Sequence, residues 1–91
     1  MSQSIDVDVS RESGGWRCTV QVRENGTATR HSVLVTDEAA TRLGAGRTPE
    51  QLVRRSFEFL LQREPKESIL PSFALTEIAR YFPEYEREIT R

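Results

Sequence analysis

A chain of 91 residues is long enough for one domain with a small core. Its 13 basic and 14 acidic residues leave a net charge of −1, which excludes bulk electrostatic attraction to nucleic acid or to anionic membranes, although not a local basic patch. The single cysteine excludes an intrachain disulfide, and no segment approaches the ~20 apolar residues of a membrane span. Because the stretch Met1–Asp6 lacks the pattern of a secretory signal, we expect a cytoplasmic protein without a membrane partner.

The first third of the chain has the pattern of three β-strands. Apolar residues alternate with polar ones in three runs, at about 5–9, 16–22 and 28–35. Ser13-Gly14-Gly15 marks a turn between the first two runs. Asn25-Gly26 separates the second from the third, and this dipeptide is the strongest short hairpin signal, because both central residues of a type I′ turn need a positive φ.

The Asn25-Gly26 turn also predicts a register. If these residues form the loop, Glu24 opposes Thr27, and counting back pairs Trp16 with Val35. One face is then apolar and contains Trp16, Cys18, Val20, Val22, Val33 and Val35. The other contains Arg17, Thr19, Gln21, Arg23, Arg30, Ser32 and Leu34. The first strand should add Ile5, Val7 and Val9 to the apolar face, and Asp6 and Asp8 to the polar face beside Arg17 and Thr19.

Two helices should follow the strands. Thr36-Asp37-Glu38 starts a short helix that ends at Leu43-Gly44, with Gly44 as the C-terminal cap. Thr48-Pro49-Glu50-Gln51 starts a longer one, because Thr48 can cap it and Gln51 completes a capping box. This helix should run to about Arg63, since the proline at position 65 disfavours helical geometry just before it.

The C-terminal segment should be less regular. Residues 66–71 are expected to form a connector, followed by a helix over about 74–82. Pro83 interrupts this helix, and residues 84–89 can add a further turn. The predicted fold is therefore a single α+β domain over 1–91. A three-stranded antiparallel meander (1–36) precedes a helical part (37–91), which contains a short helix, a long amphipathic helix and a short C-terminal helix.

The apolar face of the long helix is wider than packing against a single sheet would need. An apolar arc of roughly 200° is swept by Leu52, Val53, Ser56, Phe57, Phe59, Leu60 and Leu61. Either one side of it packs on the sheet and the other on the C-terminal segment, or part of it joins a second subunit. The meander also leaves strands one and three with free edges, and we expect strand three to be the interface edge. The candidate interface residues are Leu34, Phe57, Phe59, Phe73, Tyr81, Phe82 and Tyr85.

No catalytic motif is present. Cys18 and His31 are diagonal neighbours in the predicted hairpin, so a Cys–His nucleophile is conceivable. The pattern around Cys18 favours a small buried hydrophobe instead, and His31 should lie near the hairpin tip with one ring face wet. One cysteine and one histidine cannot alone supply a structural zinc site. We therefore predict no enzyme, no metal and no cofactor.

A modest basic group lies on the polar face of the predicted sheet. Arg17, Arg23 and Arg30 could contact a nucleic-acid backbone there. The face has no outward aromatic side chain for base stacking, and Asp6 and Asp8 dilute its charge, so an ion pair with Arg17 is the favoured interpretation and nucleic acid is not the expected partner. An antitoxin-like or regulatory nucleic-acid-binding protein is the alternative hypothesis.

Two resemblances accompany these patterns. The C-terminal half, with Thr48–Val53, Ser56–Leu61, Arg63-Glu64-Pro65, Ser68-Ile69-Leu70, Phe73 and Tyr81–Tyr85, resembles a family of small uncharacterised bacterial proteins. The strands followed by Thr48-Pro49-Glu50 and a helix are weakly similar to the N-terminal part of HicB-type antitoxins, although no ribbon-helix-helix or helix-turn-helix segment follows. The first resemblance implies a family without an assigned function, and the second is architectural only.

The leading hypothesis is a non-enzymatic cytoplasmic protein that acts through protein–protein contact. The wide apolar arc, the free edges and the aromatic C-terminal segment motivate it. We expect self-association into a homodimer, with an unidentified protein partner as the other possibility.

Overall fold

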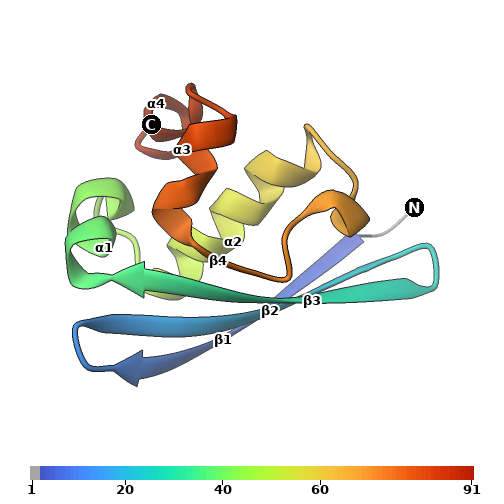
Figure 1. The fold of residues 1–91 in the computed structure, drawn as a ribbon, viewed down its shortest axis with the longest axis horizontal. Coiled ribbons are helices and arrows are strands. Elements are labelled where there is room, and N and C mark those ends of the chain that lie inside the picture. The colour runs from blue at the N-terminus through green and yellow to red at the C-terminus, as the bar shows by residue number, and fades with distance from the viewer. Residues whose placement is uncertain (1–2) are drawn as a thin grey trace.

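One four-stranded sheet carries all the helices on one of its faces (Figure 1). The computed structural model describes residues 3–91, so Met1 and Ser2, which the expectations about an N-terminal signal and a domain over 1–91 include, lie outside the described residues. The strands are β1 (Gln3–Glu12), β2 (Gly15–Glu24), β3 (Thr27–Thr36) and β4 (Ser72–Ala74), in that spatial order. The α+β class and the antiparallel meander are confirmed, but β4, which runs parallel to β3, was not expected.

The predicted register of the hairpin is confirmed. Glu24 opposes Thr27 and Trp16 opposes Val35, while Asn25 and Gly26 have φ values of 56° and 79°. The positive φ values are those that a tight two-residue turn requires. Five side chains of β2 and β3 that face the helices are completely buried: Cys18, Val20, Val22, Val33 and Val35.

β1 adds its apolar side chains to the same face. Ile5 opposes Val22, Val7 opposes Val20, and Val9 opposes Cys18. Their burial falls along the strand, from 9% exposed at Ile5 to 39% at Val9. The helices therefore cover only the first part of β1.

On the polar face one predicted contact is wrong. Asp8 opposes Thr19 as expected, but Arg17 lies opposite Ser10, next to the β1–β2 turn. The register therefore brings Glu12 within reach, and the Arg17 guanidinium lies 3.5 Å from the Glu12 carboxylate instead of pairing with Asp6 or Asp8.

The two helices after the meander begin where their caps predict. In α1 (Asp37–Gly44) the Thr36 hydroxyl accepts a hydrogen bond from the backbone N–H of Ala39. In α2 (Pro49–Leu61) the predicted capping box of Thr48 and Gln51 is present.

Their C-terminal ends differ from the prediction. The left-handed residue after α1 is Ala45, with φ of 51°, and Gly44 is the last helical residue. α2 ends at Leu61 and not at Arg63, because the backbone N–H groups of Arg63 and Glu64 both turn back to the Leu60 carbonyl and close the helix.

The C-terminal segment is divided into short pieces. It contains the 3₁₀ turn η1 (Lys66–Ser68), β4, a second 3₁₀ turn η2 (Leu75–Glu77), α3 (Ile78–Tyr81) and α4 (Tyr85–Ile89). The single helix expected over 74–82 is therefore wrong in its first part, whereas the break at Pro83 and the further turn are confirmed. None of the helices within residues 3–91 is long and apolar enough to cross a membrane.

Intramolecular packing accounts for most of the apolar arc of α2. Phe57 packs against the His31 ring, and the Phe59 ring lies 5.3 Å from that of Tyr85 on α4. The Tyr85 hydroxyl lies 2.7 Å from Ser56 Oγ, which itself donates to the Leu52 carbonyl, so this buried hydroxyl pair is satisfied. The helix is thus packed between the sheet and the C-terminal segment.

The expectation of a free β3 edge is wrong. The Ser32 N–H donates to the Pro71 carbonyl at 2.8 Å, and Phe73 and Ala74 lie opposite Val33 and Leu34. β4 therefore covers the C-terminal half of this edge. A parallel strand after a connection of more than thirty residues has no local turn signal, which is why the sequence pattern did not predict it.

Candidate functional site

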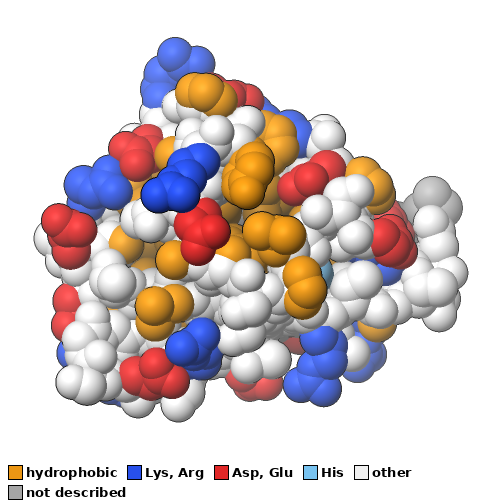
Figure 2. All heavy atoms as spheres, in the orientation of Figure 1, with side chains coloured by type: hydrophobic (Ala, Val, Ile, Leu, Met, Phe, Trp, Pro, Cys, Tyr) orange, Lys and Arg blue, Asp and Glu red, His pale blue; other side chains and the backbone are white. Residues whose placement is uncertain are grey.

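An apolar groove lies between the end of α2, the η1 segment and α3. It has a volume of about 270 Å³. Its lining consists of Leu60, Glu64, Ser68, Ile69, Leu70, Phe73, Glu77, Ile78, Tyr81 and Phe82. Figure 2 shows hydrophobic side chains gathered in the middle of this face, with both acidic and basic side chains beside them.

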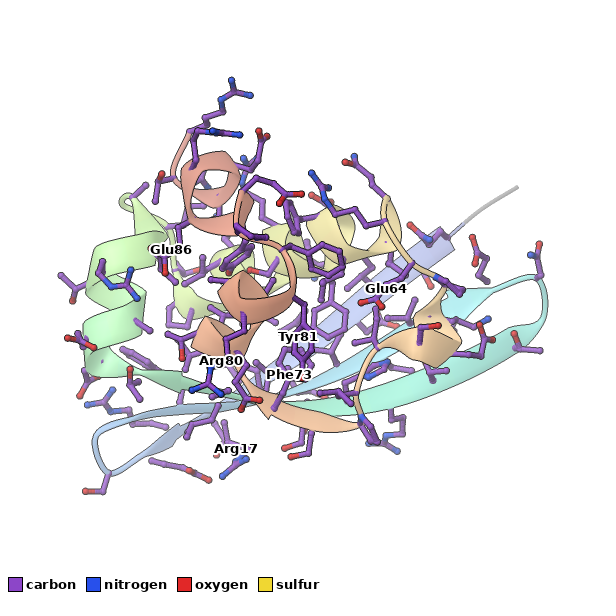
Figure 3. The ribbon with its side chains drawn as sticks, turned by 45° about the horizontal axis from the view of Figure 1, so that its top comes forward. Arg17, Glu64, Phe73, Arg80, Tyr81 and Glu86 are labelled. Carbon is purple, nitrogen blue, oxygen red and sulfur yellow. The ribbon has the colours of Figure 1, made fainter. Side chains whose placement is uncertain are left out.

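The groove is built by the end of α2, the η1 connector, β4 and the η2–α3 region, and Figure 3 labels Glu64, Phe73 and Tyr81 among its residues. Phe73 comes from β4 and is 8% exposed, so it contributes both to the core and to the groove. Tyr81 comes from α3 and is 68% exposed, and Leu70, between η1 and β4, is 45% exposed. Large apolar side chains that remain in water beside a hollow are typical of a docking surface.

The charge of the groove is acidic. Burial raises the pKa of the Glu64 carboxyl, and no hydrogen bond or charge of a residue within 3–91 contributes to this shift. The Glu77 carboxylate accepts the backbone N–H of Ala74 at 3.0 Å. No Lys or Arg is among the residues within 3–91 that line the groove. A partly buried carboxylate without a cation favours a basic ligand group.

The structure divides the seven candidate interface residues into three groups. Phe73, Tyr81 and Phe82 line the groove. Phe57, Phe59 and Tyr85 are core side chains, with exposed fractions of 7% or less, so they cannot form a surface of this fold. Leu34 is half-buried on the polar face of the sheet, beside Ala74 of β4.

Sequence reasoning missed the acidic part of the groove. The sequence analysis assigns no site role to Glu64, which precedes the helix-ending proline, and it places Leu70 in a connector. The prolines at position 65, just before this connector, and at position 71, at its end, indicated an irregular segment, but only tertiary packing brings it against α3.

The three arginines proposed for nucleic-acid contact lie on the opposite face of the sheet from the helices. Arg17 bonds to Glu12 and to the Ser32 hydroxyl, and Arg23 bonds to Gln21. Figure 3 shows Arg17 on the far side of the sheet from Phe73 and Tyr81. These bonds and the neighbouring aspartates leave a polar face of mixed charge.

Cys18 and His31 are both buried in the core. Cys18 is completely buried, and burial raises the pKa of its thiol to about 11, so the thiolate is scarce at neutral pH. His31 is 3% exposed and not wet as expected, because its ring packs on Phe57. Its Nδ1 lies 2.8 Å from the Leu70 carbonyl and Nε2 lies 2.9 Å from the Thr29 hydroxyl.

The partners of His31 engage both of its ring nitrogens. A carbonyl oxygen can only accept, so Nδ1 carries a proton and donates it to Leu70, while Nε2 is hydrogen-bonded to the Thr29 hydroxyl. Both nitrogens are thus used structurally. Within residues 3–91 there is also no cluster of three or more His, Cys, Asp or Glu side chains that could hold a metal ion.

A second, smaller hollow of about 180 Å³ lies over the middle and end of α2. Its charged side chains have both signs, and Arg63 there lies 3.6 Å above the Phe59 ring and bonds to Glu84. Because this hollow is smaller and its Arg63 is already paired, the apolar groove is the better candidate site. No protein-family model, no curated protein and no solved structure matches the chain, so its function is argued from its own surfaces.

Proposed function

We propose that this protein is non-enzymatic and acts through protein–protein contact, by binding an apolar partner segment that carries an Arg or Lys. The observation that carries the proposal is the apolar groove of about 270 Å³, with Tyr81 and Leu70 exposed beside it. Tyrosine is enriched in the energetically dominant positions of interfaces, because it offers a large apolar area together with a polar tip.

The charge of the groove supports a basic segment. Glu64 is half-buried and uncompensated, so an arginine or lysine that reaches it gains a charge-assisted hydrogen bond. Two copies of this chain that met groove to groove about a two-fold axis would instead bring acidic linings together. The homodimer expected from the sequence is therefore the less complementary occupant of this surface.

The proposal that the protein is not an enzyme is supported by the surroundings of Cys18 and His31, the two candidates for a nucleophile and its base. The Cys18 thiol is buried and has a raised pKa, and both ring nitrogens of His31 are engaged. Neither residue is among those that line the groove.

The test uses a panel of fluorescent peptides of about twelve residues, in which apolar side chains flank one Arg, and a matched panel with Glu in its place. We expect binding of the Arg panel only, measured by fluorescence anisotropy. Glu64→Lys and Tyr81→Ala should each weaken the best peptide about tenfold. Glu38→Lys, the same charge change at an exposed site on α1, is the matched control and should leave the affinity unchanged.

Two results would contradict the proposal. Equal binding of both panels would remove the charge argument, and equal affinity for wild type and both groove variants would place binding elsewhere. Native mass spectrometry of the protein alone tests whether a second copy of the chain occupies the groove. A mass of two 10.4 kDa chains that is lost in Tyr81→Ala would make a second copy the occupant.

A further inference from the structure

The backbone of β1 has an unpaired side, and its residues can be assigned. A two-residue hairpin loop is closed by a hydrogen-bonded pair, and such pairs alternate along an antiparallel ladder. The loop between β1 and β2 makes Glu12–Gly15 such a pair, so the even-numbered residues of β1 bond to β2. The odd-numbered residues therefore direct both backbone groups to the open edge.

An independent contact supports this assignment. The Arg54 guanidinium of α2 donates to the Ile5 carbonyl, which must therefore point to the open side of the sheet. Arg54 is itself held by Glu50 at 2.9 Å. The first part of the edge is thus protected by a side chain, whereas the backbone groups of Val7 and Val9 remain available.

The side chains at these two positions are also incompletely covered. Val7 is half-buried and Val9 is 39% exposed, although both face the helices. Arg11 holds the end of the strand in place, because it bonds to Asp37 at 2.6 Å and lies 4.4 Å from the centre of the Trp16 ring. A strand added here would meet an ordered edge and would cover the apolar surface of Val7 and Val9.

The charges of β1 disfavour a second copy of the same strand. Antiparallel self-pairing must place odd-numbered residues opposite odd-numbered ones, so that even-numbered residues also meet. In each two-fold register that pairs Val7 or Val9 with an odd-numbered residue between Ile5 and Arg11, two acids become opposite neighbours. The pairs that arise are Asp6–Asp6, Asp6–Asp8, Asp8–Asp8, Asp6–Glu12 and Asp8–Glu12. Directly opposed like charges destabilise a strand pair.

We propose that the open edge of β1 binds an extended segment of a partner protein in which Lys or Arg alternates with apolar residues. The apolar residues would face Val7 and Val9, and the basic ones would face Asp6, Asp8 and Glu12 on the polar side. Strand addition of this kind draws affinity from backbone hydrogen bonds and specificity from alternate side chains. This surface is separate from the groove, so the inference does not depend on the proposed function.

The probe is a capped peptide of about eight residues that alternates Lys with Val, compared with its Glu–Val counterpart. Amide hydrogen exchange should slow at least tenfold at Val7 and Val9 in the presence of the Lys–Val peptide, and should not change at Asp8, whose amide already bonds to β2. The Glu–Val peptide should bind at least tenfold more weakly.

Two changes remove the backbone contribution. The substitution Val9→Pro deletes a donor on the open side without breaking the β1–β2 ladder, and prolines are tolerated on edge strands. N-methylation of the valine amides of the peptide removes the same bonds from the other partner and leaves the protein unaltered. Each should weaken binding at least tenfold.

Several outcomes would overturn the inference. They are protection at the groove residues Leu70 and Tyr81 in place of Val7 and Val9, equal binding of both peptides, and full binding of the N-methylated peptide. A Tyr81→Ala variant that still binds the Lys–Val peptide with unchanged affinity would show that failure of the groove leaves the edge site intact.

Discussion

The two edges of the sheet are managed in different ways. At β3, the chain returns after two helices and covers half of the edge with β4, and the carbonyl of Pro71, just before β4, accepts the Ser32 N–H. At β1, the edge stays open over Val7 and Val9, with one carbonyl blocked by Arg54 and with aspartates on the polar side. The β3 edge is thus covered by hydrogen bonds to another segment of the chain, whereas the β1 edge is unpaired and carries acidic side chains.

This difference shows where new strand contacts are possible. Covering an edge with chain removes its donors and acceptors, whereas acidic side chains only select against some partners. The sequence pattern pointed to β3 because it carries Leu34 and no proline. The folded chain leaves β1 as the selective edge instead.

The largest expected effect comes from opening the closed edge. Phe73 anchors β4, since it is 8% exposed and its ring lies 6.1 Å from that of Phe57. Phe73→Ala should lower the free energy of unfolding by about 3 kcal/mol in urea titration, because it leaves a cavity under β4. The Ser32 amide should also exchange faster.

The control for this variant is Tyr81→Ala, which removes a large but exposed side chain from the same region. It should change the free energy of unfolding by less than about 0.5 kcal/mol. An unchanged exchange rate at Ser32 in Phe73→Ala would mean that β4 is held by something other than this ring.

The next effect comes from removing the charges that guard β1. The double variant Asp6→Asn, Asp8→Asn should strengthen self-association at least tenfold, about 1.4 kcal/mol, because opposed acids no longer repel in a β1–β1 pair. Sedimentation velocity at about 100 μM checks it. Neutralising Glu38 and Glu58, which are exposed on helices, changes the net charge equally and should not produce dimers. If the double variant stays monomeric, repulsion between the aspartates is not what prevents β1–β1 pairing.

A smaller effect is expected in the strand between the two edges. Burial raises the pKa of the Cys18 thiol from 9.0 to about 11, so the unfolded chain loses this proton first as the pH rises. The contribution of the protonated thiol to the free energy of unfolding is therefore fully present well below pH 9, the unfolded pKa. It is lost as the pH rises towards the folded pKa of about 11. The free energy of unfolding should fall by about 1 kcal/mol between pH 8 and pH 10.

Cys18→Ala provides the reference for this titration, because Tyr85, whose burial raises its pKa to about 12, titrates in both proteins. The difference between the two urea-unfolding curves should therefore carry the cysteine contribution alone. If the difference does not vary with pH, the thiol is not desolvated as the fold implies.

The smallest effect comes from the contact that shields the start of β1. Arg54→Ala removes the donor to the Ile5 carbonyl and should lower the free energy of unfolding by about 0.5 kcal/mol, since the guanidinium is partly exposed. Chemical shifts should change at Ile5 and not at Val9. Arg54→Lys keeps the charge and should restore part of the loss.

Much of the fold was predictable because its signals are local. The Asn25-Gly26 turn predicted the β2–β3 register, and the capping box at Thr48 predicted the start of α2. Gly15 was read as part of a turn, but it belongs to β2, where an added Cβ would lie 2.4 Å from the Val35 carbonyl oxygen. Only the approach of another strand reveals that requirement.

The groove was partly predictable. Its aromatic residues were singled out from the sequence, but those of the core and those of the groove could not be separated. Phe57 and Tyr85 are buried because α2 packs between the sheet and α4, whereas Tyr81 points away from that packing. The buried and the exposed aromatic side chains have the same apolar character, so hydrophobicity alone does not separate them.

Alternation, turn chemistry and helix caps therefore determined the meander, its register and the helix starts, because each depends on residues close together in the chain. Tertiary structure decided which edge of the sheet is covered by another strand, which aromatic side chains are exposed to solvent, and that the Glu64 side chain is half-buried. These features depend on the return of residues 72–74 to β3 and on the packing of α3 beside the connector, contacts between distant segments that no local periodicity specifies.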